Sequence, residues 1–351
     1  VLVSDIEHSA NLAPWISAGN KVVQYRMTES RMGRADDVVN EVSQSFDKQK
    51  KKGGIKLLAV TGSSNVTGFK PPLSALATIA HKNGAMILVD ACQLVQHERV
   101  LMVEEREQEP VDLDFIAFSG HKLYAPFGAG ALVGPKDFFD SVKPYQVGGG
   151  SMAYITKDLN IVRRHTVHDH ESGTPNFVGA VAMAEAMTIL YTVIGMDKVR
   201  AYEHALGERL FAGMQSIPDI RLFVRDGKRS VFPFDVEGVS ASLVAEILSR
   251  EYAVGVRAGN FCVFEFVRNV FGISRNVDEH IAQRVAGGVT RNIPSLVRAS
   301  LSIYNTPEDV DRCVEGVRAI ATNGFSYYAG TPYLRDERTG VWCDPEESCS
   351  L

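Results

Sequence analysis

The sequence predicts an α/β fold with a mainly parallel central sheet, followed by a smaller α+β domain toward the C-terminus. Two observations support this prediction. Between residues 21 and 135, short apolar runs alternate with amphipathic stretches, as in strands joined by crossover helices. After residue 195 this alternation gives way to a mixture of strands and helices. A chain of 351 residues is also long enough for two domains.

The first half of the chain contains short, strand-like apolar runs. We expect strands at Val1–Ser4, Lys21–Tyr25, Ile55–Thr61, Met86–Asp90, Phe115–Ser119 and Gly130–Gly134. Helices are expected at Asp36–Gln49 and Leu73–Lys82, the second directly after a Pro-Pro pair. A glycine run at 148–150 is typical of a loop. The apolar stretch Pro175–Ile194 is expected to form a long and mostly buried helix.

The second half mixes both kinds of element. We expect strands at Arg221–Phe223, Val231–Val236, Ala253–Arg257 and Arg298–Tyr304, and helices at Met196–Met214, Ala241–Arg250, His280–Ala286 and Glu308–Ala321. From Phe325 onward the sequence has turn-forming residues and no periodicity, so we expect an extended tail. The expected domains are therefore residues 1–194, residues 195–324 and a tail over 325–351.

Composition is that of an ordinary globular protein, with 45% hydrophobic and 23% charged residues and a net charge of -5. This charge argues against a nucleic-acid partner, and we expect no apolar run of the ~18–20 residues that cross a membrane. The five cysteines lack the spacing of a zinc site or a disulfide framework, which favours a reduced, cytoplasmic setting. The chain begins with Val1 rather than methionine, so this expectation allows for a targeting segment upstream.

Two polar side chains follow neighbouring strands of the expected sheet. Asp90 ends one strand, and Lys122 follows the next in the segment Ser119-Gly120-His121-Lys122. Because the carboxyl ends of parallel strands line one crevice, we expect both side chains at the same ligand site. A partly desolvated lysine forms Schiff bases with pyridoxal phosphate, and a carboxylate keeps the ring nitrogen of this cofactor protonated. Taken singly, Lys122 could be a surface-loop lysine and Asp90 a helix N-cap.

Eight segments in order identify a family. The chain resembles the class V aminotransferase superfamily of fold-type I pyridoxal phosphate enzymes, closest to the group II cysteine desulfurases and selenocysteine lyases. The resemblance implies the pyridoxal phosphate-dependent transferase-like fold. The matching segments are Glu7–Trp15, Ser64–Gly68, Val89–Gln93, Phe118–Tyr124, Gly148–Gly150, Glu171–Asn176, Val256–Cys262 and Arg298–Asn305.

The resemblance implies a role for each cofactor-binding residue. Lys122 would hold pyridoxal 5'-phosphate as a Schiff base, the internal aldimine. Asp90 would pair with the ring nitrogen, and Gln93 would bind the ring hydroxyl. Ser119 and His121 would donate hydrogen bonds to the phosphate.

Other roles concern the substrate and a second subunit. The resemblance implies that Thr174 reaches the phosphate of the neighbouring subunit, so that a homodimer has composite active sites. His8 would stack on the cofactor ring and move protons. Asn65 would lie beside cofactor and substrate. Arg298 would bind the carboxylate of an amino-acid substrate, because a guanidinium is planar and always charged; Arg257 would support it.

The role of Cys262 distinguishes the desulfurase reaction from the alternatives. The resemblance implies that its thiolate attacks the substrate sulfur and becomes a persulfide, which would then pass its sulfur to an acceptor protein. A neighbouring Arg257 would lower the pKa of the thiol. The alternative interpretation is a small buried residue in a turn. Cys92 and Cys313 are interpreted as packing residues.

Three features depart from the family pattern. Asn260-Phe261 replaces histidines before the loop cysteine, the segment Val267–Ser295 is long, and the family's N-terminal phosphate-binding turn has no counterpart. The leading hypothesis is a lyase that converts L-cysteine or L-selenocysteine to alanine, with the freed Lys122 removing the α-proton. One alternative is an aminotransferase- or epimerase-like enzyme in which Cys262 is not catalytic. Another is a cofactor-binding module without turnover.

Overall fold

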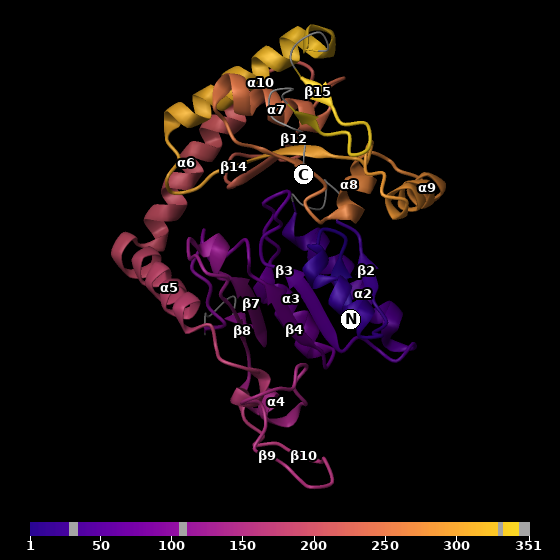
Figure 1. Cartoon of the computed structure of the whole chain (residues 1–351), viewed down its shortest axis with the longest axis vertical. Helices are drawn as coiled ribbons and strands as arrows, with labels where there is room; N and C mark the ends of the chain where they lie inside the picture. The colour runs from indigo at the N-terminus through magenta and orange to yellow at the C-terminus, as the bar shows by residue number, and fades with distance from the viewer. Residues whose placement is uncertain (28–33, 105–110, 329–332, 344–351) are drawn as a thin grey trace. The chain divides into compact units, whose positions relative to one another are not determined.

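The computed structural model describes residues 1–27, 34–104, 111–328 and 333–343 (Figure 1). The chain divides into two compact units, which we name by their place in the sequence. The central unit consists of residues 42–62 and 72–196. The flanking unit consists of residues 1–41, 63–71 and 197–351. Each unit is described by itself below.

The central unit contains four consecutive strands of a mainly parallel sheet. Their order is β3 (Leu57–Thr61), β4 (Met86–Asp90), β7 (Phe115–Ser119) and β8 (Gly130–Val133). The first three strands are parallel, and β8 is antiparallel to β7. Asp90, the last residue of β4, pairs with Ala117, two residues before the end of β7, so both strands end at the edge where ligands bind in such sheets. The predicted α/β fold with a mainly parallel sheet is confirmed.

A helix and an aspartate side chain hold the beginning of β4. Helix α3 (Leu73–Lys82) presents a buried apolar face made of Leu76, Ala77 and Ala80. At its C-terminal end, His81 Nε2 lies 2.9 Å from Asp114 Oδ2, and the same oxygen accepts a hydrogen bond from the Ile87 N–H. The remaining elements of the central unit are β5 (Val103–Glu104), β6 (Val111–Asp112), η3 (Gly120–Leu123), α4 (Lys136–Ser141), β9 (Tyr154–Ile155), β10 (Ile161–Val162), η4 (Val167–His170), α5 (Phe177–Thr188) and the π-helical turn η5 (Ile189–Ile194).

The stretch expected to be a buried helix is helical but exposed. Within α5 and η5, Phe177, Val181 and Val193 are 67%, 67% and 71% exposed. The run Phe177–Ile194 also has the length and composition of a membrane-spanning helix, which corrects the expectation that no such run exists, although one such helix is weak evidence for a membrane span. The expected burial was wrong because the apolar composition of a helix does not determine how much of it the rest of the chain packs against.

The flanking unit combines a parallel strand pair with an antiparallel sheet. The pair is β1 (Leu2–Ser4) and β2 (Val23–Tyr25). The sheet has the order β11 (Ile220–Leu222), β12 (Val231–Val236), β14 (Leu296–Ser300) and β13 (Arg257–Gly259). Its helices are η1 (Ser9–Asn11), α1 (Ala13–Ser17), α6 (Met196–Gln215), α7 (Ala241–Tyr252), α8 (Phe264–Val270), α9 (Arg275–Ala286) and α10 (Pro307–Tyr328). Helix α2 (Ala35–Lys50) contains the first division point between the units.

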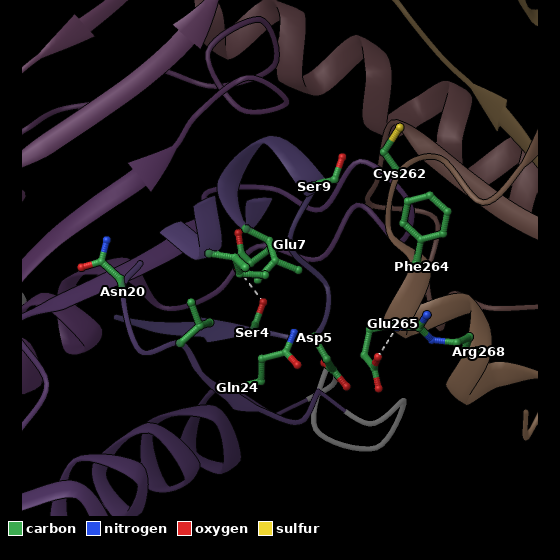
Figure 2. Close-up of a pocket in the computed structure, with 13 residues that line it drawn as sticks. Ser4, Asp5, Glu7, Ser9, Asn20, Gln24, Cys262, Phe264, Glu265 and Arg268 are labelled. Carbon is green, nitrogen blue, oxygen red and sulfur yellow. Dashed lines mark hydrogen bonds and ion pairs between the residues drawn. The ribbon is translucent and has the colours of Figure 1, made fainter. Parts of the chain in front are cut away.

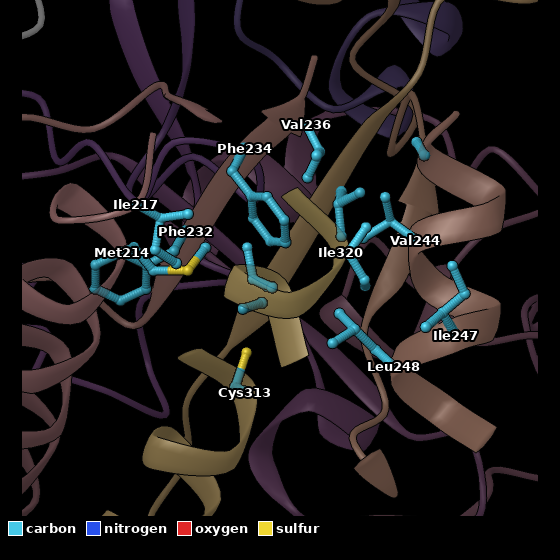
Figure 3. Close-up of a cluster of buried hydrophobic side chains, with 14 of the residues drawn as sticks. Met214, Ile217, Phe232, Phe234, Val236, Val244, Ile247, Leu248, Cys313 and Ile320 are labelled. Atoms are coloured by element: carbon cyan, nitrogen blue, oxygen red, sulfur yellow. The ribbon is translucent and has the colours of Figure 1, made fainter. Parts of the chain in front are cut away.

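One hydrophobic core supports this second sheet (Figure 3). Phe232 and Phe234 are two positions apart on β12 and therefore lie on the same face of the strand. Ile247 and Leu248 of α7 and Cys313 of α10 belong to the same buried cluster. Full burial raises the pKa of the Cys313 thiol to about 12. Cys313 is thus a packing residue, as expected.

Several boundaries differ from the sequence prediction. The strand expected at 253–257 begins only at Arg257, because Ala253 ends α7 in the left-handed conformation with φ 51°. The strand expected at 298–304 is β14, shifted toward the N-terminus. Helix α10 continues past a kink at Gly324 to Tyr328, and β15 (Leu334–Arg335) pairs with β16 (Trp342–Cys343) in the segment where an extended tail was expected. The last part of that segment, 344–351 with Cys349, lies outside the described residues.

Candidate functional site

Lys122 lies in the short turn η3, directly after β7. The turn requires glycine at position 120: the Gly120 N–H donates to the Ala129 carbonyl at 2.7 Å, and a Cβ at Gly120 would lie only 3.0 Å from the same oxygen. A larger residue would therefore push the turn away from β8. Glycine allows the close approach that presents the half-buried Lys122 at the end of the sheet.

Four polar side chains gather where β4 and β7 end, and we call Asp90, Cys92, Ser119 and Lys122 the central cluster. The Cys92 N–H donates to Asp90 Oδ1 at 3.0 Å. The pKa of the Cys92 thiol is raised to about 11, mainly by burial and then by the Asp90 carboxylate, while Ser119 and Lys122 act in the opposite direction. The structure therefore brings together the predicted lysine and carboxylate, as well as a thiol that the sequence analysis treated as packing.

The hydroxyl of Ser119 is available to a ligand. Its Oγ atom is buried and has no hydrogen-bond partner of normal geometry within the described residues. It approaches the Cys92 thiol closely enough to lower the thiol pKa, but not in hydrogen-bonding geometry. A buried hydroxyl without a partner costs about 1–3 kcal/mol, a cost that a bound acceptor such as a phosphate oxygen removes. The central cluster thus offers a nucleophilic amine, a carboxylate and a hydroxyl donor, which fits pyridoxal phosphate.

Three other residues predicted for the cofactor lie in the central unit without a hydrogen bond to the central cluster, as far as the structure describes the chain. Gln93 accepts a hydrogen bond from Gln96 at 3.3 Å. His121 is exposed on η3, and Thr174 is exposed in the loop before α5. Their assigned roles stay predictions.

In the flanking unit, Arg298 is a cation without a carboxylate partner among the described residues. It lies on β14 opposite Arg257 of β13. Its Nη1 donates to the Asn65 carbonyl at 2.7 Å, its guanidinium lies 4.9 Å from the centre of the Phe261 ring, and its buried Nε has no hydrogen-bond partner. Burial, and then the charge of Arg257, lower the pKa of Arg298 to about 10. Two adjacent cations with a free N–H favour binding of an anion such as a carboxylate.

The loop that carries Cys262 is held in a strained conformation. Phe261 and Cys262 both have left-handed backbones, with φ 54° and 59°, which is rare for residues other than glycine. Three hydrogen bonds hold this geometry: Asn65 Nδ2 to the Phe261 carbonyl, Cys262 N–H to Asn260 Oδ1, and Ser9 N–H to the Cys262 carbonyl, at 2.9, 3.1 and 2.8 Å. Such strain is typical of functional sites, where the surroundings hold a side chain in a required position.

His8 lies next to this loop through its neighbour Ser9. Its Nδ1 accepts a hydrogen bond from the Ala10 N–H at 3.1 Å, which caps η1 and fixes the ring. The structure therefore groups five predicted residues of the flanking unit: His8, Asn65, Arg257, Cys262 and Arg298. The sequence interpretation missed the supporting roles of Asn260 and Phe261. For Asn260 a signal was available, because an Asn side chain in a turn commonly accepts a hydrogen bond from the backbone N–H two residues later.

A cavity of about 560 Å³ lies within the flanking unit, with Cys262 and Ser9 at one end (Figure 2). Its charged lining residues are Asp5, Glu7, Glu265 and Arg268, and Glu265 pairs with Arg268 at 2.6 Å. Burial raises the pKa of Asp5 to about 6, and the charge of Glu265 acts in the same direction, although the Met27 N–H donates to this carboxylate at 2.7 Å.

The raised pKa of Asp5 predicts a pH-dependent stability. The folded protein binds this proton more tightly than the unfolded chain, whose aspartate pKa is about 3.9. This contribution is therefore complete below pH ~4 and lost as the pH rises through about 6. In the wild type, the ionisation of Asp5 should lower the free energy of unfolding by at most about 3 kcal/mol between acidic and neutral pH. We expect Asp5→Asn to lack this decrease. Urea unfolding at several pH values measures it; Asp47→Asn, at an exposed carboxylate, is the control. Parallel pH profiles for wild type and Asp5→Asn would contradict it.

Known proteins resemble the chain over most of its length. The family model described as aminotransferase class-V matches residues 1–313. A cysteine desulfurase of Klebsiella pneumoniae is 29% identical over 330 residues, covering 91% of this chain and 70% of that protein. Among solved structures, the cysteine desulfurase CsdA of Escherichia coli matches with a TM-score of 0.72 and 27% identity, covering 91% of this chain and 71% of that one. The apo cysteine desulfurase of Thermococcus onnurineus matches with a TM-score of 0.71 and 26% identity, covering 92% and 72%.

Proposed function

The chain belongs to the class-V aminotransferase family, and from this we propose that it is a pyridoxal phosphate-dependent cysteine desulfurase. The reaction takes sulfur from L-cysteine and leaves alanine. The proposal depends mainly on one observation: Arg298 has no carboxylate partner among the described residues and contacts Asn65 and Phe261, and these contacts connect it to the strained loop of Cys262. A carboxylate-binding cation beside a presented thiol suits an amino-acid substrate whose sulfur is to be accepted. Relatives named as cysteine desulfurases support the same reaction.

The residues that would hold the cofactor are those of the central cluster and its neighbours. When bound, pyridoxal phosphate supplies an aldehyde and a ring that accepts electrons from the substrate. Lys122 would bind the aldehyde carbon, and the Asp90 carboxylate would accept a hydrogen bond from the ring nitrogen and keep it protonated. Ser119 and His121 would donate to the phosphate, and Gln93 would bind the ring hydroxyl.

The chain's own residues would then act on the substrate in turn. Arg298, supported by Arg257, would bind the α-carboxylate, and the amine of Lys122 would remove the α-proton. The Cys262 thiolate would attack the substrate sulfur, forming an S–S bond while the Cβ–S bond breaks. The electron pair of the broken bond would stay on the organic product, which takes up protons to become alanine. An acceptor thiol, on a protein or a small molecule, would then attack the outer sulfur and release the Cys262 thiolate.

One experiment tests this function. The purified protein with pyridoxal phosphate, L-cysteine and an excess of a thiol reductant is expected to release sulfide and alanine in equal amounts. L-selenocysteine is expected to give alanine and selenide. A cofactor absorption band without sulfur release would contradict the desulfurase and favour an aminotransferase- or epimerase-like enzyme. No band and no turnover would contradict both.

Arg298→Ala is expected to raise the KM for L-cysteine by about 10–100-fold, because a charge-assisted hydrogen bond contributes about 1.5–3 kcal/mol. The cofactor absorption band should be unchanged, because Arg298 is assigned to the substrate alone. Steady-state kinetics with a parallel spectrum measure both quantities. Arg200→Ala, at an arginine half exposed and paired with Asp197, is the control and should leave KM unchanged. A loss of kcat at constant KM would contradict the carboxylate role.

The proposal includes a homodimer, with a second copy covering the exposed apolar face of α5. Val181→Glu is expected to convert dimer to monomer, because a buried charge without a partner would stand in the contact. Val103→Glu is the matched control, since Val103 is 72% exposed but lies on β5. Light scattering after size-exclusion chromatography measures the mass. A monomeric wild type, or a Val181→Glu variant that stays dimeric, would contradict this surface.

A further inference from the structure

A second cavity, of about 520 Å³, lies within the flanking unit and shares no lining residue with the cavity beside Cys262. Its volume is in the range of small-molecule sites in proteins. Most of its wall comes from the start of α7, the end of β13, the segment between α9 and β14, and the β15–β16 hairpin. The function proposed above makes no use of this cavity.

Two of these wall segments lie outside the family pattern. The β15–β16 hairpin follows residue 313, where the match to the class-V family model ends. The segment between α9 and β14 belongs to Val267–Ser295, which is long compared with the family pattern. Membership of the family therefore does not account for this cavity.

Hydrogen bonds hold the hairpin against the rest of the wall. The N–H groups of Thr290 and Arg291 both donate to the Arg338 carbonyl at 3.1 Å. The Ser242 hydroxyl at the start of α7 donates to the Gly340 carbonyl at 3.3 Å. Position 340 requires glycine, because its φ is 74° and a Cβ there would lie 2.9 Å from Arg291 Cβ. Specific contacts therefore form the cavity wall.

Arg335 is a lining residue whose positive charge has no carboxylate partner among the residues that the structure describes. Its Nη2 donates to Asn292 Oδ1 at 2.7 Å, so a neutral amide holds the guanidinium at the wall without compensating its charge. By contrast, Glu337 of the same hairpin forms an ion pair with Arg291 at 2.6 Å. The other N–H groups of Arg335 can bind a carboxylate, whose two oxygens match the fork of a guanidinium.

Asp235 of β12 lines the same cavity and supplies the opposite charge. It is half-buried, and burial raises the pKa of its carboxyl group, an effect that the charge of Arg221 on β11 only partly offsets. Within the described ranges, Asp235 forms no ion pair with Arg335 or with any other residue. Two opposite charges that face one cavity without pairing favour a ligand that itself carries both charges.

We propose that this cavity binds a free α-amino acid with an apolar side chain. The carboxylate of the ligand pairs with Arg335, and its ammonium group pairs with Asp235. The side chain of the ligand contacts the apolar part of the lining, which includes Val239, Ile273, Ile293 and Val341. This inference concerns a second site, so it depends neither on the release of sulfur nor on pyridoxal phosphate.

Calorimetric titration of the full chain with three matched probes tests the proposal. L-leucine carries both charges, isoamylamine lacks its carboxylate, and isocaproate lacks its amine. We expect L-leucine to bind at least ~10-fold more tightly than either of the others, because each of these leaves one charge of the cavity without a partner. Equal affinities for the three probes, or no binding of L-leucine at millimolar concentration, would overturn the proposal.

Two variants of nearly unchanged size assign each charge to its partner. Arg335→Gln and Asp235→Asn are each expected to weaken the binding of L-leucine by at least ~10-fold. Arg335→Gln should then bind L-leucine and isoamylamine alike, and Asp235→Asn should bind L-leucine and isocaproate alike. Arg338→Gln, at an exposed arginine of the same hairpin outside the lining, is the control and should bind L-leucine like the wild type. Wild-type affinity in both cavity variants would refute the site.

Arg298→Ala separates this cavity from the substrate site of the proposed function. It should keep the binding of L-leucine that Arg335→Gln loses. The opposite result, a loss in Arg298→Ala alone, would place the amino acid at Arg298 and overturn the inference. A protein that binds L-leucine as expected but releases no sulfur from L-cysteine would contradict the desulfurase and leave the second site standing.

Discussion

Lys122→Ala is expected to abolish turnover and the absorption band of the bound cofactor together. In the central cluster, Lys122 supplies the one amine, since Asp90, Cys92 and Ser119 provide a carboxylate, a thiol and a hydroxyl. Both the covalent attachment of the cofactor and the removal of the α-proton depend on this amine in the proposed function. We expect alanine formation to fall by at least ~10³-fold, within the range of general-base and covalent catalysis. Absorption spectroscopy and an alanine assay on the same sample measure both effects.

The matched control is Lys82→Ala, because Lys82 is an exposed lysine at the end of α3 in the same unit. It should leave both the band and the turnover unchanged. Circular dichroism would show whether Lys122→Ala is folded, and the Ser119–Gly120 backbone turn does not involve the lysine side chain. A Lys122→Ala variant that keeps its band would place the cofactor on another lysine and overturn the assignment of the central cluster.

The sequence predicted the sheet edge well, because local pattern and topology agree there. The strands Met86–Asp90 and Phe115–Ser119 and the helix Leu73–Lys82 have the predicted boundaries in the structure. Strands of a parallel sheet are buried on both faces, so each appears as one continuous apolar run that ends at a polar residue. The match of the class-V family model over residues 1–313 confirms the resemblance drawn from eight short motifs.

Other features depend on contacts that no local pattern records. The apolar run of α5 predicts burial, whereas the structure shows much of the helix exposed. The surroundings of Cys92 could not be predicted either, because Ser119 and Lys122, which affect the pKa of its thiol, belong to or follow a different strand. The left-handed conformation of Cys262 depends likewise on Asn65, almost two hundred residues away.

Cys262→Ser is expected to abolish sulfur release while leaving the cofactor absorption band intact. The substitution preserves the loop, because the hydrogen bonds at this residue use its backbone: its N–H donates to Asn260 Oδ1, and its carbonyl accepts from Ser9. A serine hydroxyl stays protonated at neutral pH and cannot accept sulfur as a persulfide, whereas a thiolate can. We expect sulfide and alanine formation to fall by at least ~10³-fold. Assays of both products with L-cysteine, beside the absorption spectrum, measure the effect.

The outcome separates the two enzyme hypotheses because each assigns Cys262 differently. A desulfurase needs the thiol at the sulfur-accepting step. The variant should therefore still bind the cofactor and L-cysteine, and its absorption band should change when the substrate is added. The reaction should then stop before sulfur is released. Cys313→Ala, which removes a core thiol, should lose some stability and keep its activity per folded molecule. If Cys262→Ser released alanine at the wild-type rate, the thiol would have no role in the reaction. The strained loop would then serve only to place Asn65 and Arg298 around the substrate carboxylate, as in an aminotransferase- or epimerase-like enzyme.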